Sequence, residues 1–131
     1  MAATTAIHHL DEPVTAVRST LQQFAVAAAS SDGVLLGGLD AIDQIEVRTR
    51  NTVYHITVLA GPDARVLIQG GRYFPVQSEV RVNGSTLGGS LLKVGWIGCG
   101  FCMELVHEGQ RITTTRVREI RRVDTPAPAL H

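Results

Sequence analysis

Residues 44–59 read QIEVRTRNTVYHITVL, and this stretch decides the fold class. Between positions 45 and 50, Ile, Val and Thr occupy the odd positions, whereas Glu, Arg and Arg occupy the even ones. A period of two is typical of a strand with one buried face. Residues 52–59 are rich in β-branched side chains, which favour a second strand. The stretch therefore predicts two successive strands.

Strand and turn signals continue at short intervals to residue 123. Glycine, proline and asparagine mark turns because they tolerate or favour the backbone angles that turns need. Apolar or β-branched runs lie between these turns, which are predicted at Gly61-Pro62-Asp63, Asn83-Gly84 and Glu108-Gly109, with strands at Arg65–Gln69, Val76–Val82, Leu91–Val106 and Arg111–Val123. We therefore expect a small antiparallel β-barrel of six or seven strands.

Upstream of these strands, the apolar residues change to helical spacing. From Val14 to Ala28 they recur every three or four positions, and Pro13 suits a first helical turn. One amphipathic N-terminal helix and a barrel make the expected fold mainly β (α+β), in a single domain. The predicted order is a loose tail (1–12), the helix (13–30), a connector (31–43), the barrel (44–123) and a disordered C-terminal tail (124–131).

The composition indicates a folded domain and excludes some partners. Hydrophobic residues make up 44% of the chain and charged residues 18%, which is enough apolar material for a core. Because 12 Lys and Arg balance 12 Asp and Glu, nucleic acid is an unlikely partner. No apolar run approaches the roughly 18 residues of a membrane span, so no membrane association is expected. Two cysteines without a leader indicate a reducing compartment, and we expect a bacterial cytoplasm.

A C-x-x-C motif, Cys99-Gly100-Phe101-Cys102, is one candidate for chemistry. Two thiols at this spacing can form a redox disulfide. Together with His107 they match three of the four ligands of a zinc knuckle, but Ile112 stands where the fourth is needed. The alternation around them predicts a strand, which would place Cys99 and Cys102 on opposite faces as reduced, structural cysteines. A thiol redox or zinc protein is one alternative.

The run from Asn83 to Gly88, NGSTLG, fits the pattern N-x-S-x-x-G. It resembles the second motif of the PilZ family, six-stranded barrels that bind cyclic di-GMP. The resemblance implies that Asn83, Ser85 and Gly88 would meet guanine and phosphate groups of a nucleotide. The family carries R-x-x-x-R ahead of this motif, whereas here that pattern runs from Arg118 to Arg122, after it. The resemblance therefore covers six residues.

Two arginines extend this motif into a candidate site for an anionic small ligand. Arg72 follows a glycine pair, and Arg81 precedes the predicted Asn83-Gly84 turn, so in a meander of hairpins both would flank one barrel mouth. Guanidinium groups near backbone N–H groups are suited to phosphate. The candidate ligand-binding residues are Arg72, Arg81, Asn83, Ser85 and Gly88. A nucleotide sensor that uses them is the main alternative function.

Arginines also gather near the C-terminus. On an extended strand Arg116, Arg118 and Arg122 would point one way, but the residues between them include no aromatic side chain for stacking on bases. We expect a solvated basic face that protects a sheet edge.

No pattern of catalytic residues stands out in the sequence, and no metal or cofactor is expected. The sequence therefore predicts a non-enzymatic binding or interaction module. Its partner is expected to be a second copy of the chain or another protein, because the apolar helix face needs more cover than a small barrel provides.

Overall fold

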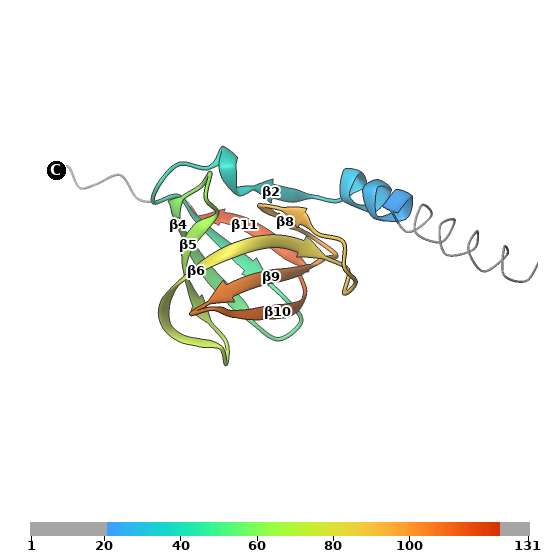
Figure 1. The fold of residues 1–131 in the computed structure, drawn as a ribbon. Helices are drawn as coiled ribbons and strands as arrows, with labels where there is room; N and C mark the ends of the chain where they lie inside the picture. Colours follow the sequence, from blue (N-terminus) through green and yellow to red (C-terminus); the bar gives the residue numbers. More distant parts are fainter. Residues whose placement is uncertain (1–20, 124–131) are drawn as a thin grey trace, which may run out of the picture. The chain divides into compact units, whose positions relative to one another are not determined.

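The computed structural model describes residues 21–123, and the chain divides into two compact units, Met1–Ser30 and Ser31–His131. In the first unit, residues 21–30 form a helix (Figure 1). The Ser30 hydroxyl donates to the carbonyl of Val26 at 2.9 Å, within the last turn. The predicted helix is thus confirmed over 21–30. Its first part, 13–20, and both predicted tails lie outside the described residues.

The second unit is built from antiparallel strands that follow one another closely. The expected strands in the middle of the chain are confirmed, and so is the turn at Glu108-Gly109. The strands are β2 (Gly33–Leu35), β3 (Gln44–Arg48), β4 (Val53–Ala60), β5 (Arg65–Gly70), β6 (Phe74–Thr86), β7 (Lys93–Val94), β8 (Trp96–Gly98), β9 (Cys102–His107), β10 (Gln110–Arg116) and β11 (Glu119–Val123), and a short 3-10 helix, η1 (Leu36–Gly38), follows β2.

These strands form one eight-stranded sheet and one small ribbon. The large sheet has the order β10-β9-β6-β5-β4-β3-β11, and β7 pairs with β6 beside this path. The ribbon joins β2 to β8, so the predicted connector over 31–43 in fact contains a strand and η1. None of the helices within residues 21–123 has the length and apolarity needed to cross a membrane.

The sheet is not closed into a barrel, which corrects the predicted architecture. Its path of pairings has two ends, β10 and β11, although these strands are consecutive in the chain. The predicted strand Arg111–Val123 breaks at Val117, whose N–H donates to Phe101 at 2.8 Å. The next N–H, that of Arg118, donates to Arg48 at 2.7 Å. Before the break the chain pairs with β9, and after it the chain pairs with β3. The two halves of the predicted strand, β10 and β11, therefore lie at opposite ends of an open sheet.

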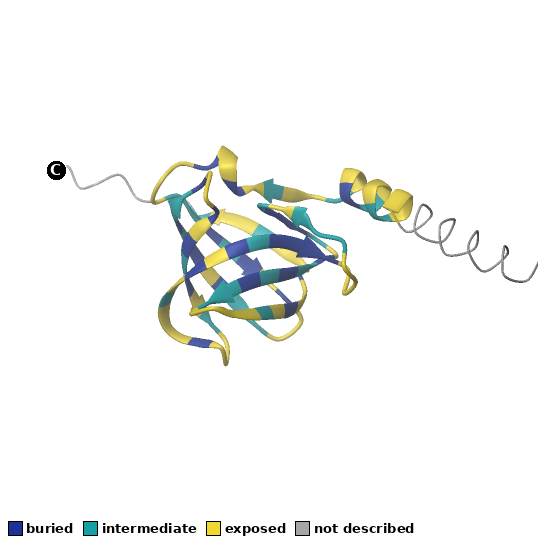
Figure 2. Ribbon diagram, in the orientation of Figure 1, coloured by how far each residue is buried: buried dark blue, intermediate teal, exposed yellow. Residues whose placement is uncertain are grey.

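The core is formed by the buried residues that alternate with exposed residues along the strands. In β3, Ile45 and Val47 are buried while Arg48 is exposed, and β4 and β5 repeat this pattern at Ile56 and Ile68. Figure 2 shows buried and exposed residues alternating along the strands. The apolar face predicted from the period of two therefore packs into one core with residues from β6 and β9.

Glycines reshape two of the predicted elements. Asn83-Gly84 is not a turn but lies inside β6, where Gly84 has a φ of 150° and the register shifts between Val82 and Gly84. Such a shift is a β-bulge, which bends the strand. The predicted long strand Leu91–Val106 is divided into β7, β8 and β9 by Gly95 and Gly100, which both have positive φ.

Candidate functional site

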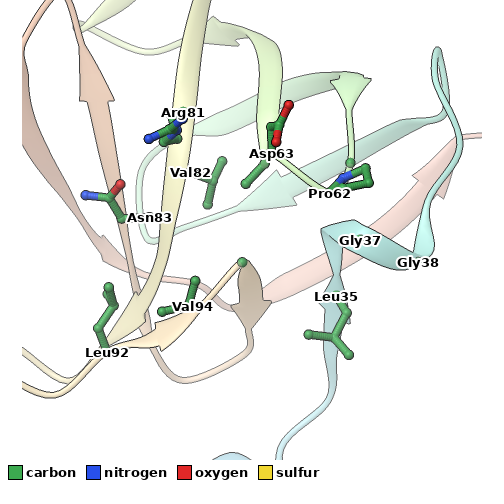
Figure 3. A pocket seen from close by; sticks show the side chains of 13 residues that line it. Leu35, Gly37, Gly38, Pro62, Asp63, Arg81, Val82, Asn83, Leu92 and Val94 are labelled. Carbon is green, nitrogen blue, oxygen red and sulfur yellow. The ribbon is translucent and has the colours of Figure 1, made fainter.

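A groove of about 640 Å³ lies in the second unit (Figure 3). Four segments line it: the region of β2 and η1, the turn over residues 61–64, β6 from Arg81 to Asn83, and residues 92–95. Gly37, Gly38, Gly61 and Gly95 are part of this lining. Because glycines carry no side chain, the backbone borders the groove directly at these points.

The groove has an apolar wall that is open to solvent. Val94 is 75% exposed and Leu35 is 57% exposed, although both are large hydrophobic residues. In Figure 3, Leu92 and Val94 lie on one side and Leu35 and Pro62 on the other. An exposed apolar patch bounded by polar groups is typical of a binding site.

Two charged side chains line the same groove without a partner among residues 21–123. Arg81 lies on β6, directly opposite Arg65 on β5. The guanidinium of Arg65 lies 3.4 Å from Glu79, whereas that of Arg81 forms no ion pair within this range. Asp63, in the turn before β5, likewise has no ion pair there. The groove therefore offers one free cation and one free anion.

Asn83 is the third polar residue of the lining, and a neighbour fixes its side chain. Its Nδ2 donates to Oε2 of Glu104 on β9 at 2.9 Å. This bond orients the amide, whose oxygen has no hydrogen bond within the described part of the chain. Asn83 can therefore accept a hydrogen bond from a ligand while its nitrogen is already engaged.

The structure brings together only two of the five predicted ligand-binding residues, Arg81 and Asn83. Arg72 lies in the turn that joins β5 to β6, whereas Arg81 pairs with Arg65 at the other end of that hairpin. Phe74 and Arg81 are seven residues apart on β6, about 23 Å at the usual rise of a strand. The two arginines thus do not flank one mouth, contrary to the expectation.

The other two predicted residues form bonds within the protein. Ser85 is fully buried, and its hydroxyl donates to the carbonyl of Trp96 at 2.7 Å and accepts from Gly98 N–H at 3.1 Å. The Gly88 N–H donates to Oγ1 of Thr86 at 3.1 Å. Neither residue lines the groove. A nucleotide site on the Asn83–Gly88 motif stays a prediction, and the Ser85 hydroxyl does not face solvent.

The cysteines lie around a turn rather than on one strand, which corrects that expectation. Cys99 follows β8 and Cys102 begins β9, and both are free and partly exposed. They line different concavities: Cys99 and Asp32 line one, and Cys102 and Arg50 line the other. Burial raises the pKa of the Cys99 thiol, and the nearby Asp32 raises it further. A raised pKa makes this thiol less reactive.

The residues suggested for zinc are not gathered. Within the described residues, no group of three or more His, Cys, Asp or Glu side chains could hold a metal ion. The His107 ring instead packs edge-on against Phe74, with ring centroids 5.5 Å apart.

Sequence reasoning missed most of the groove's lining. The sequence predicts that Leu35 lies in a connector and that Leu92 and Val94 lie in one longer strand. The available signals were the glycine pair at 37–38 and the turn at Gly61-Pro62-Asp63, since both mark places where backbone can border a cavity.

The groove combines an apolar wall with an unpaired arginine and an unpaired aspartate. No protein-family model matches the chain, and neither a curated protein nor a solved structure does. What the groove binds is therefore inferred from its own side chains.

Proposed function

We propose that the chain is a non-enzymatic binding module whose groove takes a short segment of a protein partner. The observation that carries the proposal is the exposed apolar wall of Leu35 and Val94 beside the unpaired Arg81. A peptide segment presents apolar side chains, both charge signs and backbone hydrogen-bonding groups. It can therefore satisfy the apolar wall, Arg81, Asp63 and the Asn83 oxygen together.

The groove's polar residues support binding rather than catalysis. Those within the described lining are Asp63, Arg81 and Asn83, with no serine, cysteine, histidine or lysine among them. Nucleophilic catalysis needs an activated nucleophile beside a base, and general acid–base catalysis usually needs a histidine or a second carboxylate. The groove thus supplies recognition groups without a reacting group.

Selection from a random peptide library tests the proposal. Peptides that bind the wild-type protein are expected to combine an apolar residue with an acidic residue, because Arg81 provides an unpaired positive charge. With Arg81→Glu as bait, the acidic preference should change to a basic one. Binders whose NMR shift changes lie away from residues 61–64, 81–83 and 92–95, or equal enrichment on both baits, would contradict the proposal.

Arg81→Ala is expected to weaken binding of a selected peptide about tenfold, the loss of one charge-assisted contact. The measurement is isothermal titration calorimetry. Arg65→Ala is the matched control, since Arg65 lies directly opposite Arg81 but pairs with Glu79 and does not line the groove. Equal losses in the two variants would show that general surface charge, not the groove, governs binding.

We also propose that a second copy of the chain covers the helix over residues 21–30. Leu21 is 47% exposed and Val26 is 62% exposed on this helix, which leaves apolar surface for association. In sedimentation equilibrium the wild type is expected to form a dimer and the Leu21→Ser/Val26→Ser variant a monomer. Ala29→Ser, at another exposed helix position, should stay dimeric. A wild type that is monomeric at all concentrations would contradict the proposal.

A further inference from the structure

A second concavity, of about 380 Å³, is lined mostly by arginines. Its lining residues are Arg50, Cys102, Thr115, Arg116 and Arg118, none of which lines the groove described above. They come from the turn between β3 and β4, the start of β9, the end of β10 and the residue before β11. No carboxylate is among the described residues that line this concavity, which we call the arginine pocket.

The backbone brings the three arginines together. Arg116 pairs with Cys102 across β10 and β9, at the end of the irregular stretch of that ladder. The chain then breaks at Val117, and the Arg118 N–H donates to Arg48 at the end of β3. Arg50 lies two residues after Arg48, in the following turn. The same break that opens the sheet therefore carries Arg118 towards Arg50.

Neighbouring arginines are neutralised, which makes the arginine pocket distinctive. Arg48 pairs with Glu119 of β11 at 3.7 Å, Arg121 with Glu46 of β3 at 2.8 Å, and Arg122 with Asp43, the residue before β3, at 3.1 Å. This pairing also interrupts the basic face predicted from Arg116, Arg118 and Arg122.

In the described chain, Arg50 and Arg118 have no carboxylate within ion-pair distance. Among the described residues, the Arg116 side chain has one hydrogen-bond acceptor, the carbonyl of Gly100, to which Nη1 donates at 3.0 Å. Three arginines thus line one small concavity, and none of them forms an ion pair within residues 21–123, although Arg118 also lines the neighbouring concavity with Asp32 and Glu119. Like charges that line one concavity repel one another, and a bound anion would reduce that repulsion.

We propose that the arginine pocket binds the phosphate group of a small phosphomonoester. Each guanidinium offers several N–H donors in a fixed plane. A phosphate group has more acceptor oxygens than a carboxylate and can therefore accept hydrogen bonds from more of these donors. A phosphomonoester carries nearly two negative charges at neutral pH, against three positive charges at the pocket. The volume suits a small molecule rather than a nucleic acid strand.

Cys102 provides a direct test because it lines the arginine pocket together with all three arginines, whereas Cys99 lines another concavity that shares only Arg118 with it. We expect AMP to slow alkylation of Cys102 by iodoacetamide and to leave the rate at Cys99 unchanged, as measured by mass spectrometry. The titration is run at constant ionic strength, since salt alone screens arginines. Inorganic phosphate and sulfate form the other arms and separate a phosphomonoester site from a general anion site.

Arg50→Ala and Arg118→Ala are each expected to raise the AMP concentration needed for protection about tenfold, the loss of one charge-assisted contact. Arg111→Ala is the matched control, because Arg111 is exposed on β10 but lies outside the pocket lining. Both substituted arginines are exposed, so thermal unfolding without ligand should be unchanged, and this is measured alongside.

The proposal is overturned if AMP protects neither cysteine, if it protects both equally, or if sulfate and phosphate protect as well as AMP does. It is also overturned if the double variant of Arg50 and Arg118 keeps full protection. None of these results bears on the peptide groove, because the two sites share no lining residue and the groove is read out by peptide binding.

Discussion

Gly84→Ala is expected to lower the free energy of unfolding by about 3 kcal/mol, the largest effect of any single-methyl change that we predict. Gly84 lies in the bulge of β6 with a φ of 150°, a conformation that residues with a side chain rarely adopt. A Cβ added there would overlap the carbonyl oxygen of Lys93 and lie 3.0 Å from Cα of Val94. Both are backbone atoms of β7, so no side-chain rotation relieves the overlap.

The loss should come from the pairing of β6 with β7. Gly84 is paired with Val94 on one side and with Glu104 of β9 on the other, so the added methyl group pushes directly on a strand of the sheet. The residues displaced, around Val94, also line the groove. Chemical denaturation monitored by circular dichroism measures the change in stability, and peptide binding should weaken in the same variant.

Two other glycines separate the causes. Gly88 has a φ of 101°, but a Cβ added there would meet no atom within 4 Å, so Gly88→Ala tests backbone strain alone and should cost about 1 kcal/mol. Gly89 has no positive φ, and a Cβ added there would meet no atom within 4 Å, so Gly89→Ala should be nearly neutral. Equal effects at Gly84 and Gly88 would mean that the contact with Lys93 contributes nothing.

Local patterns predicted the middle of the fold because the deciding forces there are local. β3 and β4 carry a period of two, and Gly61-Pro62-Asp63 sets the turn before β5. The two end strands of the sheet, β10 and β11, could not be predicted as separate strands because distant contacts determine where each one pairs. Nothing near Val117 indicates a break, because the break is set by distant partners, Phe101 and Arg48, across the sheet. Predicting an open sheet instead of a barrel required those long-range pairings.

Asn83-Gly84 shows how one signal fits two structures. Asparagine and glycine both accept unusual backbone angles, which serve a hairpin turn or a bulge equally well. Only the partners on both sides of β6 decide in favour of the bulge. Because the strand continues, Arg81 and Asn83 stay on the groove while Ser85 is carried into the interior. The candidate site was therefore predicted in part, from residues on the near side of the bulge.

Ser85→Ala is expected to lower the free energy of unfolding by about 2 kcal/mol, since the serine hydroxyl on β6 is a structural group that holds β8 of the small ribbon through two hydrogen bonds. The residue is fully buried, and the oxygen bridges the Trp96 carbonyl at 2.7 Å and the Gly98 N–H at 3.1 Å. Removing it leaves a buried N–H and a buried carbonyl without this partner. The cost of such groups exceeds the small gain from a more apolar side chain.

The chain's single tryptophan reports this change directly. Trp96 is buried, and its ring packs edge-on against Phe101, with centroids 5.2 Å apart. Urea denaturation followed by tryptophan fluorescence should show a lower midpoint in Ser85→Ala with an unchanged slope, the signature of lost stability within the same folded state. Ser78→Ala is the matched control, because within residues 21–123 the Ser78 hydroxyl donates only to the nearby Val76 carbonyl on the same strand.

The same variant distinguishes the structural role of Ser85 from the ligand-binding role that the N-x-S-x-x-G motif suggests. If the hydroxyl faced a nucleotide, Ser85→Ala would weaken nucleotide binding and leave unfolding unchanged, as happens at exposed binding residues. If the hydroxyl instead holds β8 against β6, the free energy of unfolding decreases. Binding at the groove then weakens only to the extent that the folded state is lost. We expect the second result, because a hydroxyl that already donates to one backbone group and accepts from another, with no exposed surface, has little capacity left for a ligand.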